Sequence, residues 1–67
     1  MTLSKVIDEI DYDFYYISLH QNNKRIDGAF KYNAVKKLAP YLNCEVIDIN
    51  PSENSSIAII SIEGGGV

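Results

Sequence analysis

The apolar run at residues 57–62, which three glycines closely follow, most constrains how this chain can fold. Ile59 and Ile60 would point to opposite sides of an extended strand, so both sides of that strand would be apolar. We therefore predict a core strand that is covered on both sides. Three successive glycines disfavour helix and strand, because glycine loses the most backbone entropy on ordering. The sequence thus predicts one domain over residues 1–63 and a flexible glycine-rich tail over residues 64–67.

Composition favours a small domain that folds without a covalent link. A chain of 67 residues buries only about 60% of the surface that it exposes when unfolded. Hydrophobic residues make up 46% of it and charged residues 22%, which excludes intrinsic disorder. Cys44 is the single cysteine, so no internal disulfide can form and a reducing compartment is indicated.

Charge and hydropathy exclude two classes of partner. The formal net charge is -3, whereas proteins that neutralise phosphates carry the opposite balance. No apolar run approaches the ~20 residues of a membrane span, and the first residues lack the apolar stretch of a signal peptide. We expect a cytoplasmic protein with no membrane partner and no direct nucleic-acid partner.

Periodicity in the first half of the chain predicts a helix and a hairpin. Apolar residues at i, i+3, i+4 and i+7 indicate an amphipathic helix over residues 3–10, with Thr2 as its N-cap. This helical stripe consists of Leu3, Val6, Ile7 and Ile10. Aromatic and β-branched residues then predict a strand over 14–20, and polar turn residues separate it from an antiparallel strand over 25–30.

The second half repeats this pattern. Val35, Leu38 and Leu42 belong to the stripe of a second helix, predicted over residues 33–42 with Asn33 as its N-cap. Pro40 lacks the amide that this helix needs, so the helix either kinks there or ends and restarts as one turn. Two further strands are predicted, over residues 44–49 and 56–63, with a polar loop over residues 50–55 between them.

These elements predict a small α+β domain of αββαββ order. Two helices on one face of a mainly antiparallel four-stranded sheet would bury both amphipathic stripes. The side chains that we expect to be mostly buried are Leu3, Val6, Ile7, Ile10, Ile17, Leu19, Val35, Leu38, Leu42, Ile47, Ile49, Ile57, Ile59 and Ile60.

An acidic and aromatic tract near the first helix is the best candidate for binding a partner. Tyrosines bring a large contact area at low entropic cost, and acids beside them select a basic partner surface. We predict that the partner-binding residues are Asp8, Glu9, Asp11, Tyr12, Asp13, Tyr15 and Tyr16. The alternative is a solvated surface. A metal site is disfavoured, because the tract lacks the turn glycine and the later glutamate of a calcium loop.

No set of residues indicates catalysis. His20 is the single histidine, and nothing near it in the sequence completes a catalytic dyad. Cys44 stands in apolar company, which favours a small buried side chain over a nucleophile. We expect a protein that is not an enzyme and that carries no cofactor and no metal.

Three functional hypotheses remain. The first is a small acidic protein-binding regulator or inhibitor that covers the surface of its target, similar in general style to phage or mobile-element inhibitors. The second rests on residues 57–66, where a strand that runs into a glycine tail resembles ubiquitin-like sulfur or modifier carriers; Val67 follows the glycines, where those carriers end on glycine. The third is a structural homo-oligomer, because a small domain gains stability by burying a sheet edge or a helix face against a copy of itself.

Overall fold

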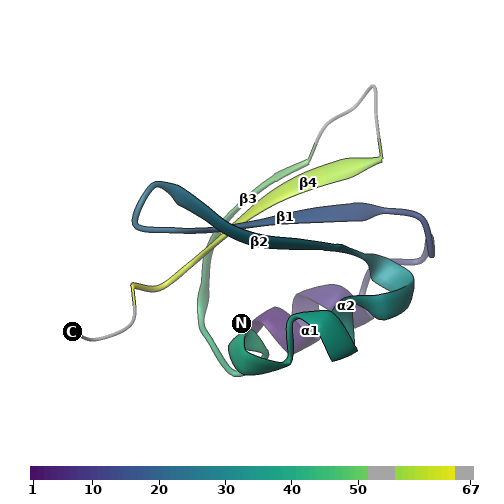
Figure 1. Cartoon of the computed structure of the whole chain (residues 1–67), viewed down its shortest axis with the longest axis horizontal. Coiled ribbons are helices and arrows are strands. Elements are labelled where there is room, and N and C mark those ends of the chain that lie inside the picture. Colours follow the sequence, from purple (N-terminus) through teal and green to yellow (C-terminus); the bar gives the residue numbers. More distant parts are fainter. Residues whose placement is uncertain (52–55, 65–67) are drawn as a thin grey trace.

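The computed structural model describes residues 1–51 and 56–64 and has a small α+β fold (Figure 1). Its elements are α1 (Leu3–Asp8), β1 (Tyr16–Gln21), β2 (Lys24–Phe30), α2 (Lys31–Lys37), the 3₁₀ helix η1 (Ala39–Tyr41), β3 (Val46–Pro51) and β4 (Ile57–Ile62). The predicted order of helices and strands is therefore confirmed. The predicted glycine tail lies outside the described residues, apart from Gly64.

The four strands form one mixed sheet in the order β2-β1-β4-β3. β1 pairs with β2 and β4 pairs with β3 in antiparallel fashion, and the two central strands, β1 and β4, are parallel. Two of the three pairings are thus antiparallel, which agrees with the prediction of a mainly antiparallel sheet. The parallel pairing places strands from the two halves of the chain side by side.

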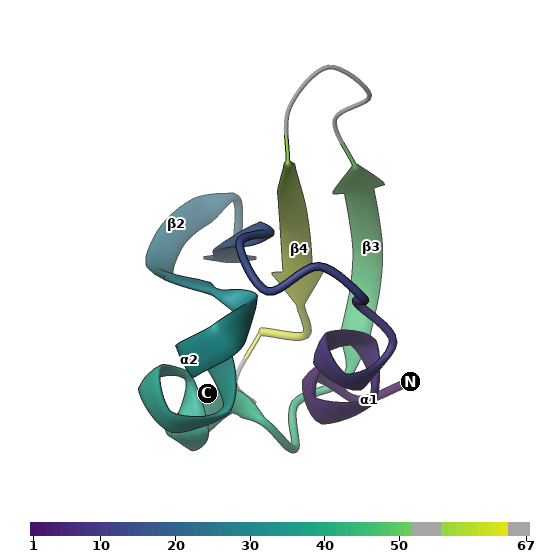
Figure 2. The same ribbon diagram turned by 90° about the vertical axis from the view of Figure 1, so that its right-hand side faces the viewer.

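Side chains at alternate positions of the central strands β1 and β4 point into the core. Ile17 and Leu19 of β1 pair with Ala58 and Ile60 of β4, and all four are buried. The full cluster of buried apolar residues is Leu3, Val6, Ile7, Ile17, Leu19, Ala29, Ala34, Leu38, Ala58, Ile60 and Ile62. α1 and α2 contact each other and lie below the strands in the views of Figures 1 and 2. Both helices and the sheet therefore contribute to a single core.

The helix α1 begins as predicted and ends earlier. The Thr2 hydroxyl accepts a hydrogen bond from the Lys5 backbone amide at 3.4 Å, so the predicted N-cap is confirmed. The helix ends at Asp8 with Glu9 as its C-cap, rather than at Ile10. Carboxylates at this end of a helix oppose its dipole, which favours the early termination. Ile10 nevertheless packs against the core.

The predicted N-cap of the second helix is wrong. α2 starts at Lys31, directly after β2, and Asn33 lies inside the helix. Its N-cap residue, Phe30, makes no capping bond through its side chain. Backbone carbonyls of the loop before β1 take that role, because Asp13 O and Tyr15 O accept bonds from the first two amides of α2 at 3.0 and 2.8 Å.

Pro40 ends the regular helix, as one of the two alternatives predicted. α2 stops at Lys37, and the 3₁₀ helix η1 (Ala39–Tyr41) follows after Leu38. Proline is tolerated in the first turn of a new helix, where its missing amide has no partner to lose. Leu38 is fully buried between the two segments.

Five apolar residues that were predicted to be buried are exposed instead. They are Val35, Ile47, Ile49, Ile57 and Ile59, each at least 40% exposed. The prediction of a last strand covered on both sides is therefore wrong. The helices have six and seven residues, so together they cover little sheet area. Three alanines occupy core positions in place of the larger residues, namely Ala29, Ala34 and Ala58.

Adjacent isoleucines of β4 provide a matched test of this core. Ile60 is fully buried and Ile59 is 40% exposed. We expect Ile60→Ala to lower the free energy of unfolding by roughly 2 to 5 kcal/mol, enough to unfold much of a marginal domain. Ile59→Ala should lower it by less than about 1 kcal/mol. Urea unfolding followed by circular dichroism measures both values, and equal losses for the two variants would contradict the described placement of β4.

Candidate functional site

The four acids of the predicted tract lie at the surface. Asp8 ends α1 and Glu9 caps it, and both side chains are exposed. Asp11 and Asp13 are exposed in the loop between α1 and β1. The acids thus remain available to a partner, along a segment that alternates acids with aromatic rings.

The three tyrosines of the tract have different environments. Tyr12 is 51% exposed in the loop between α1 and β1. Tyr15 is half-buried against the core, and its hydroxyl donates a hydrogen bond to the Ile57 carbonyl at 3.4 Å. Tyr16 begins β1 and is also half-buried. Tyr15 therefore has a structural role, whereas Tyr12 is fully suited to contact a partner.

Aromatic rings form a continuous series of contacts across the surface, which we call the aromatic row. Its members, in order, are Tyr12, Phe14, Tyr32, Phe30 and Tyr16. Neighbouring ring centroids are 5.8, 5.8, 5.7 and 5.1 Å apart, within the range of favourable aromatic pairs. None of the seven aromatic residues belongs to the buried core cluster; Tyr15 and Tyr41 pack against it, and the other five form this row.

Two segments of the chain carry the four exposed rings of the aromatic row. Tyr12 and Phe14 come from the loop before β1, and Phe30 and Tyr32 come from the junction of β2 with α2. The bond from the Tyr32 amide to the Asp13 carbonyl joins these two segments. This bond fixes the two backbone segments relative to each other, which lowers the entropy that a partner would have to remove on binding.

Three rings of the row were missing from the predicted site. Phe14 and Tyr32 are 61% and 60% exposed, the largest values among the aromatic residues. The sequence contained one signal, because Tyr12 with Phe14 and Phe30 with Tyr32 repeat the same i, i+2 spacing. Neither pair lies in extended backbone, because a bond from the Tyr15 amide to the Tyr12 carbonyl closes a turn and Tyr32 lies in α2, so the spacing alone does not place the rings together.

A second cluster surrounds Arg25 on the side of the sheet opposite the core positions of β1. The Arg25 guanidinium donates to the Tyr16 hydroxyl at 2.5 Å and to the Ser18 hydroxyl at 3.3 Å. The Ser18 hydroxyl is also 3.1 Å from Nε2 of His20. Gly28 leaves the space that this arrangement needs, because a Cβ there would overlap the Tyr16 hydroxyl and the Arg25 guanidinium. Neutral hydroxyl groups therefore hold the guanidinium over Gly28.

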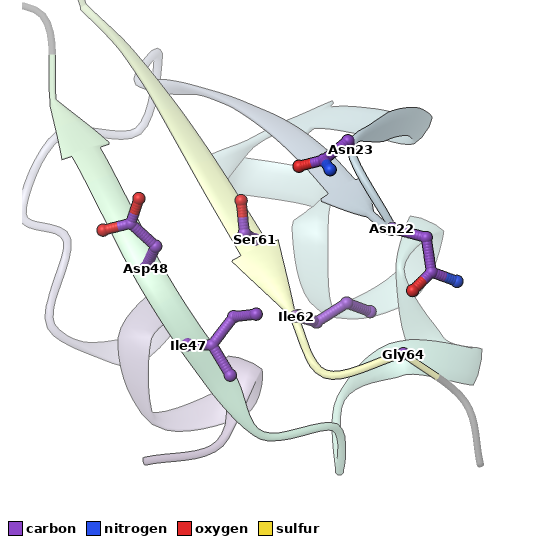
Figure 3. A pocket seen from close by; sticks show the side chains of 7 residues that line it. All are labelled: Asn22, Asn23, Ile47, Asp48, Ser61, Ile62 and Gly64. Atoms are coloured by element: carbon purple, nitrogen blue, oxygen red, sulfur yellow. The ribbon is translucent and has the colours of Figure 1, made fainter.

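A hollow of about 330 Å³ lies at the end of the sheet near the β1–β2 turn (Figure 3). Its lining residues are Asn22, Asn23, Ile47, Asp48, Ser61, Ile62 and Gly64. Asn22 and Asn23 have φ values of 55° and 64°, as a tight hairpin turn requires. The Asp48 and Ser61 side chains both point toward the top of Figure 3, from the neighbouring strands β3 and β4. The hollow thus offers oxygen acceptors, one of them a carboxylate, beside an apolar wall.

His20 and Cys44 occupy different parts of the fold. The His20 ring is half-buried and lies against Ser18, as described above. Cys44 is half-buried and packs against the core, just before β3. The absence of catalysis stays a prediction.

Residues 1–51 and 56–64 contain no group of three or more His, Cys, Asp or Glu side chains that could hold a metal ion. Within the same ranges, no helix has the length and apolarity needed to cross a membrane. No protein-family model matches this chain, and neither a curated protein nor a solved structure matches it. The candidate surfaces therefore rest on geometry alone.

Gly28→Ala tests the arrangement around Arg25. The new methyl group would push away the ends of two flexible side chains, and the strand would lose a glycine that weakens it by roughly 0.5 to 1 kcal/mol. We expect the free energy of unfolding to change by less than about 1 kcal/mol while the bond from Arg25 to Tyr16 is lost. Arg25 is the single arginine, so its Nε–H resonance in a ¹⁵N NMR spectrum is unambiguous and should shift.

Gly64→Ala is the matched control. A Cβ at Gly64 would meet the Asn22 side chain instead, so the Arg25 resonance should stay in place. A Gly28→Ala spectrum with an unmoved Arg25 resonance would show that the described contact does not form.

Proposed function

We propose that this protein is a small protein-binding regulator or inhibitor that uses the aromatic row to cover the surface of a partner. In this proposal α1 and α2 both pack on one face of the sheet, and the loop before β1 presents the row beside them. The observation that carries the proposal is the exposure of the rings, since four of the five are at least 39% exposed. Contiguous apolar surface of this kind marks interaction sites in monomeric domains.

The acids beside the rings indicate the chemistry of the partner. Asp11 and Asp13 flank Tyr12 in the exposed loop, and Asp13 adjoins Phe14. Carboxylates at the rim select lysines and arginines on the partner and accelerate association. Those cations also bind favourably over the faces of exposed tyrosine and phenylalanine rings. A partner with a basic surface fits both features.

Phe14 is the residue to truncate first. It contacts the rings of Tyr12 and Tyr32 and is 61% exposed, so its loss should leave the core intact. We expect Phe14→Ala to weaken partner binding by roughly 2 kcal/mol or more, as for an anchor at the centre of an interface. Tyr12→Ala should act in the same direction.

The partner is first recovered by affinity capture from a lysate of the source organism, with quantitative mass spectrometry. Binding constants are then measured for wild type, Phe14→Ala and a Lys36→Glu, Lys37→Glu control on the exposed side of α2. Loss of binding in the lysine control alone would place the functional surface on α2 and overturn the proposal.

Reversing the acids should affect the rate more than the strength of binding. In an Asp11→Lys, Asp13→Lys variant we expect slower association and a weaker dependence on salt, because rim charges mainly steer the encounter. Each exposed carboxylate should contribute less than about 1 kcal/mol to affinity. Surface plasmon resonance at two salt concentrations separates the two rate constants, and an unchanged association rate would contradict the steering role.

A further inference from the structure

The outer side of the sheet, defined as the strand positions that alternate with the core positions, carries a regular grid of side chains. One row of neighbouring residues crosses all four strands and consists of Arg25, His20, Ser61 and Asp48, on β2, β1, β4 and β3 respectively. We call it the charged row. A cation thus stands at one edge of the sheet and an anion at the other edge.

Apolar residues occupy the centre of the same side. Ile59 pairs with Ser18, and Ile57 pairs with Tyr16, in the two rows that follow the charged row. Both isoleucines are at least 40% exposed although they stand on a central strand of the sheet. The outer side therefore combines an exposed apolar centre with one charge of each sign at its edges.

We propose that a second copy of this chain packs face to face on the outer side, about a two-fold axis parallel to the strands. Such an axis reverses the strand order, so β2 lies over β3 of the second copy and β1 lies over its β4. Arg25 then stands opposite Asp48 of the second copy, and Asp48 stands opposite its Arg25. The charged row is thus complementary to itself, as an isologous interface requires.

The apolar rows match in the same way. Tyr16 lies over Ile57 of the second copy, and Ser18 lies over its Ile59, so the exposed isoleucines of both chains become enclosed. Packed sheets are about 10 Å apart, a gap that an arginine and an aspartate side chain span together. In the single chain Arg25 donates to Ser18 of its own sheet, and Asp48 accepts a bond from Asn50 at 2.9 Å, so both side chains would turn outward to meet across the two copies.

Charge favours a second copy over an acidic or a basic partner at this surface. The chain as a whole has a net charge of -3, which makes two copies repel each other. The acids Asp8, Glu9, Asp11 and Asp13 lie on α1 and in the loop that follows it, outside the four strands. Arg25 and Asp48 balance each other on the outer side. Among residues 1–51 and 56–64, the hydrogen-bond partners of the Arg25 side chain are neutral hydroxyls.

The size of the surface sets the conditions of the test. Four strands of about six residues present a face of roughly 400 Å² in projection, about half of what each partner buries in a standard interface, so the dimer is a weak one. We therefore expect a dimer with a dissociation constant in the micromolar range, so sedimentation velocity is run up to about 1 mM protein.

Charge exchange provides the decisive experiment. We expect wild type to dimerise, and Arg25→Glu and Asp48→Lys each to dimerise at least about ten-fold more weakly, because both place like charges opposite each other twice. An equimolar mixture of the two variants should recover dimerisation, since every facing pair in the mixed dimer is again of opposite sign. Lys37→Glu and Asp11→Lys make the same charge changes elsewhere and should dimerise like wild type.

Wild type also provides a test that needs no variant. In a mixture of ¹³C-labelled and unlabelled chains, filtered NMR spectra should show contacts between the Tyr16 ring of one copy and the Ile57 methyl groups of the other. A wild-type monomer at the highest concentration, a mixture that stays monomeric, or contacts between copies through α2 would each overturn the proposal. None of these outcomes depends on the partner of the aromatic row.

Discussion

The parallel pairing of β1 with β4 is the contact on which the rest of the fold depends. It joins the segment that contains α1 and the first hairpin to the segment that contains α2 and the second. Ile17, Leu19 and Ile60 meet along it and are fully buried. Each hairpin alone would be marginal in water, because two strands cannot enclose an apolar side. The parallel pairing joins them in one sheet, and buried residues of both helices and of this sheet belong to one core cluster.

The short helices then determine what the sheet leaves exposed. Both α1 and α2 have fewer than two turns, and three alanines reduce the space between the layers. A core of this size takes one alternating set of strand side chains and leaves the other set at the surface. Ile57 and Ile59 on the outer side of β4 are the result. The small size of the core also leaves the aromatic row at the surface. The short helices thus limit the stability of the domain and at the same time leave apolar surface for binding.

Local patterns predicted much of this architecture. The 3.6-residue period located both helices, Thr2 was found as a cap, and Pro40 marked the end of α2. The sequence could not show which side of β4 faces the core, because both of its sides are isoleucine-rich. The order of the strands in the sheet and their register could not be predicted from the sequence either. Strand pairing brings Arg25 close to Tyr16 and aligns the charged row from Arg25 to Asp48. The contact of Phe14 with Tyr32 likewise depends on how the segments of the chain pack together.

The two proposed surfaces meet at the paired residues Tyr16 and Phe30. The Tyr16 ring packs edge-on against Phe30 at the end of the aromatic row, and the Tyr16 hydroxyl accepts the bond that positions Arg25 over Gly28. The exposed end of the aromatic row comes from a loop and from α2, beyond the strands that a face-to-face dimer covers. A two-fold axis parallel to the strands places the aromatic rows of both copies at the same end of the dimer. A dimeric partner, or one with repeated basic sites, would then meet two rows at once, and its binding would gain from the high effective concentration of the second contact.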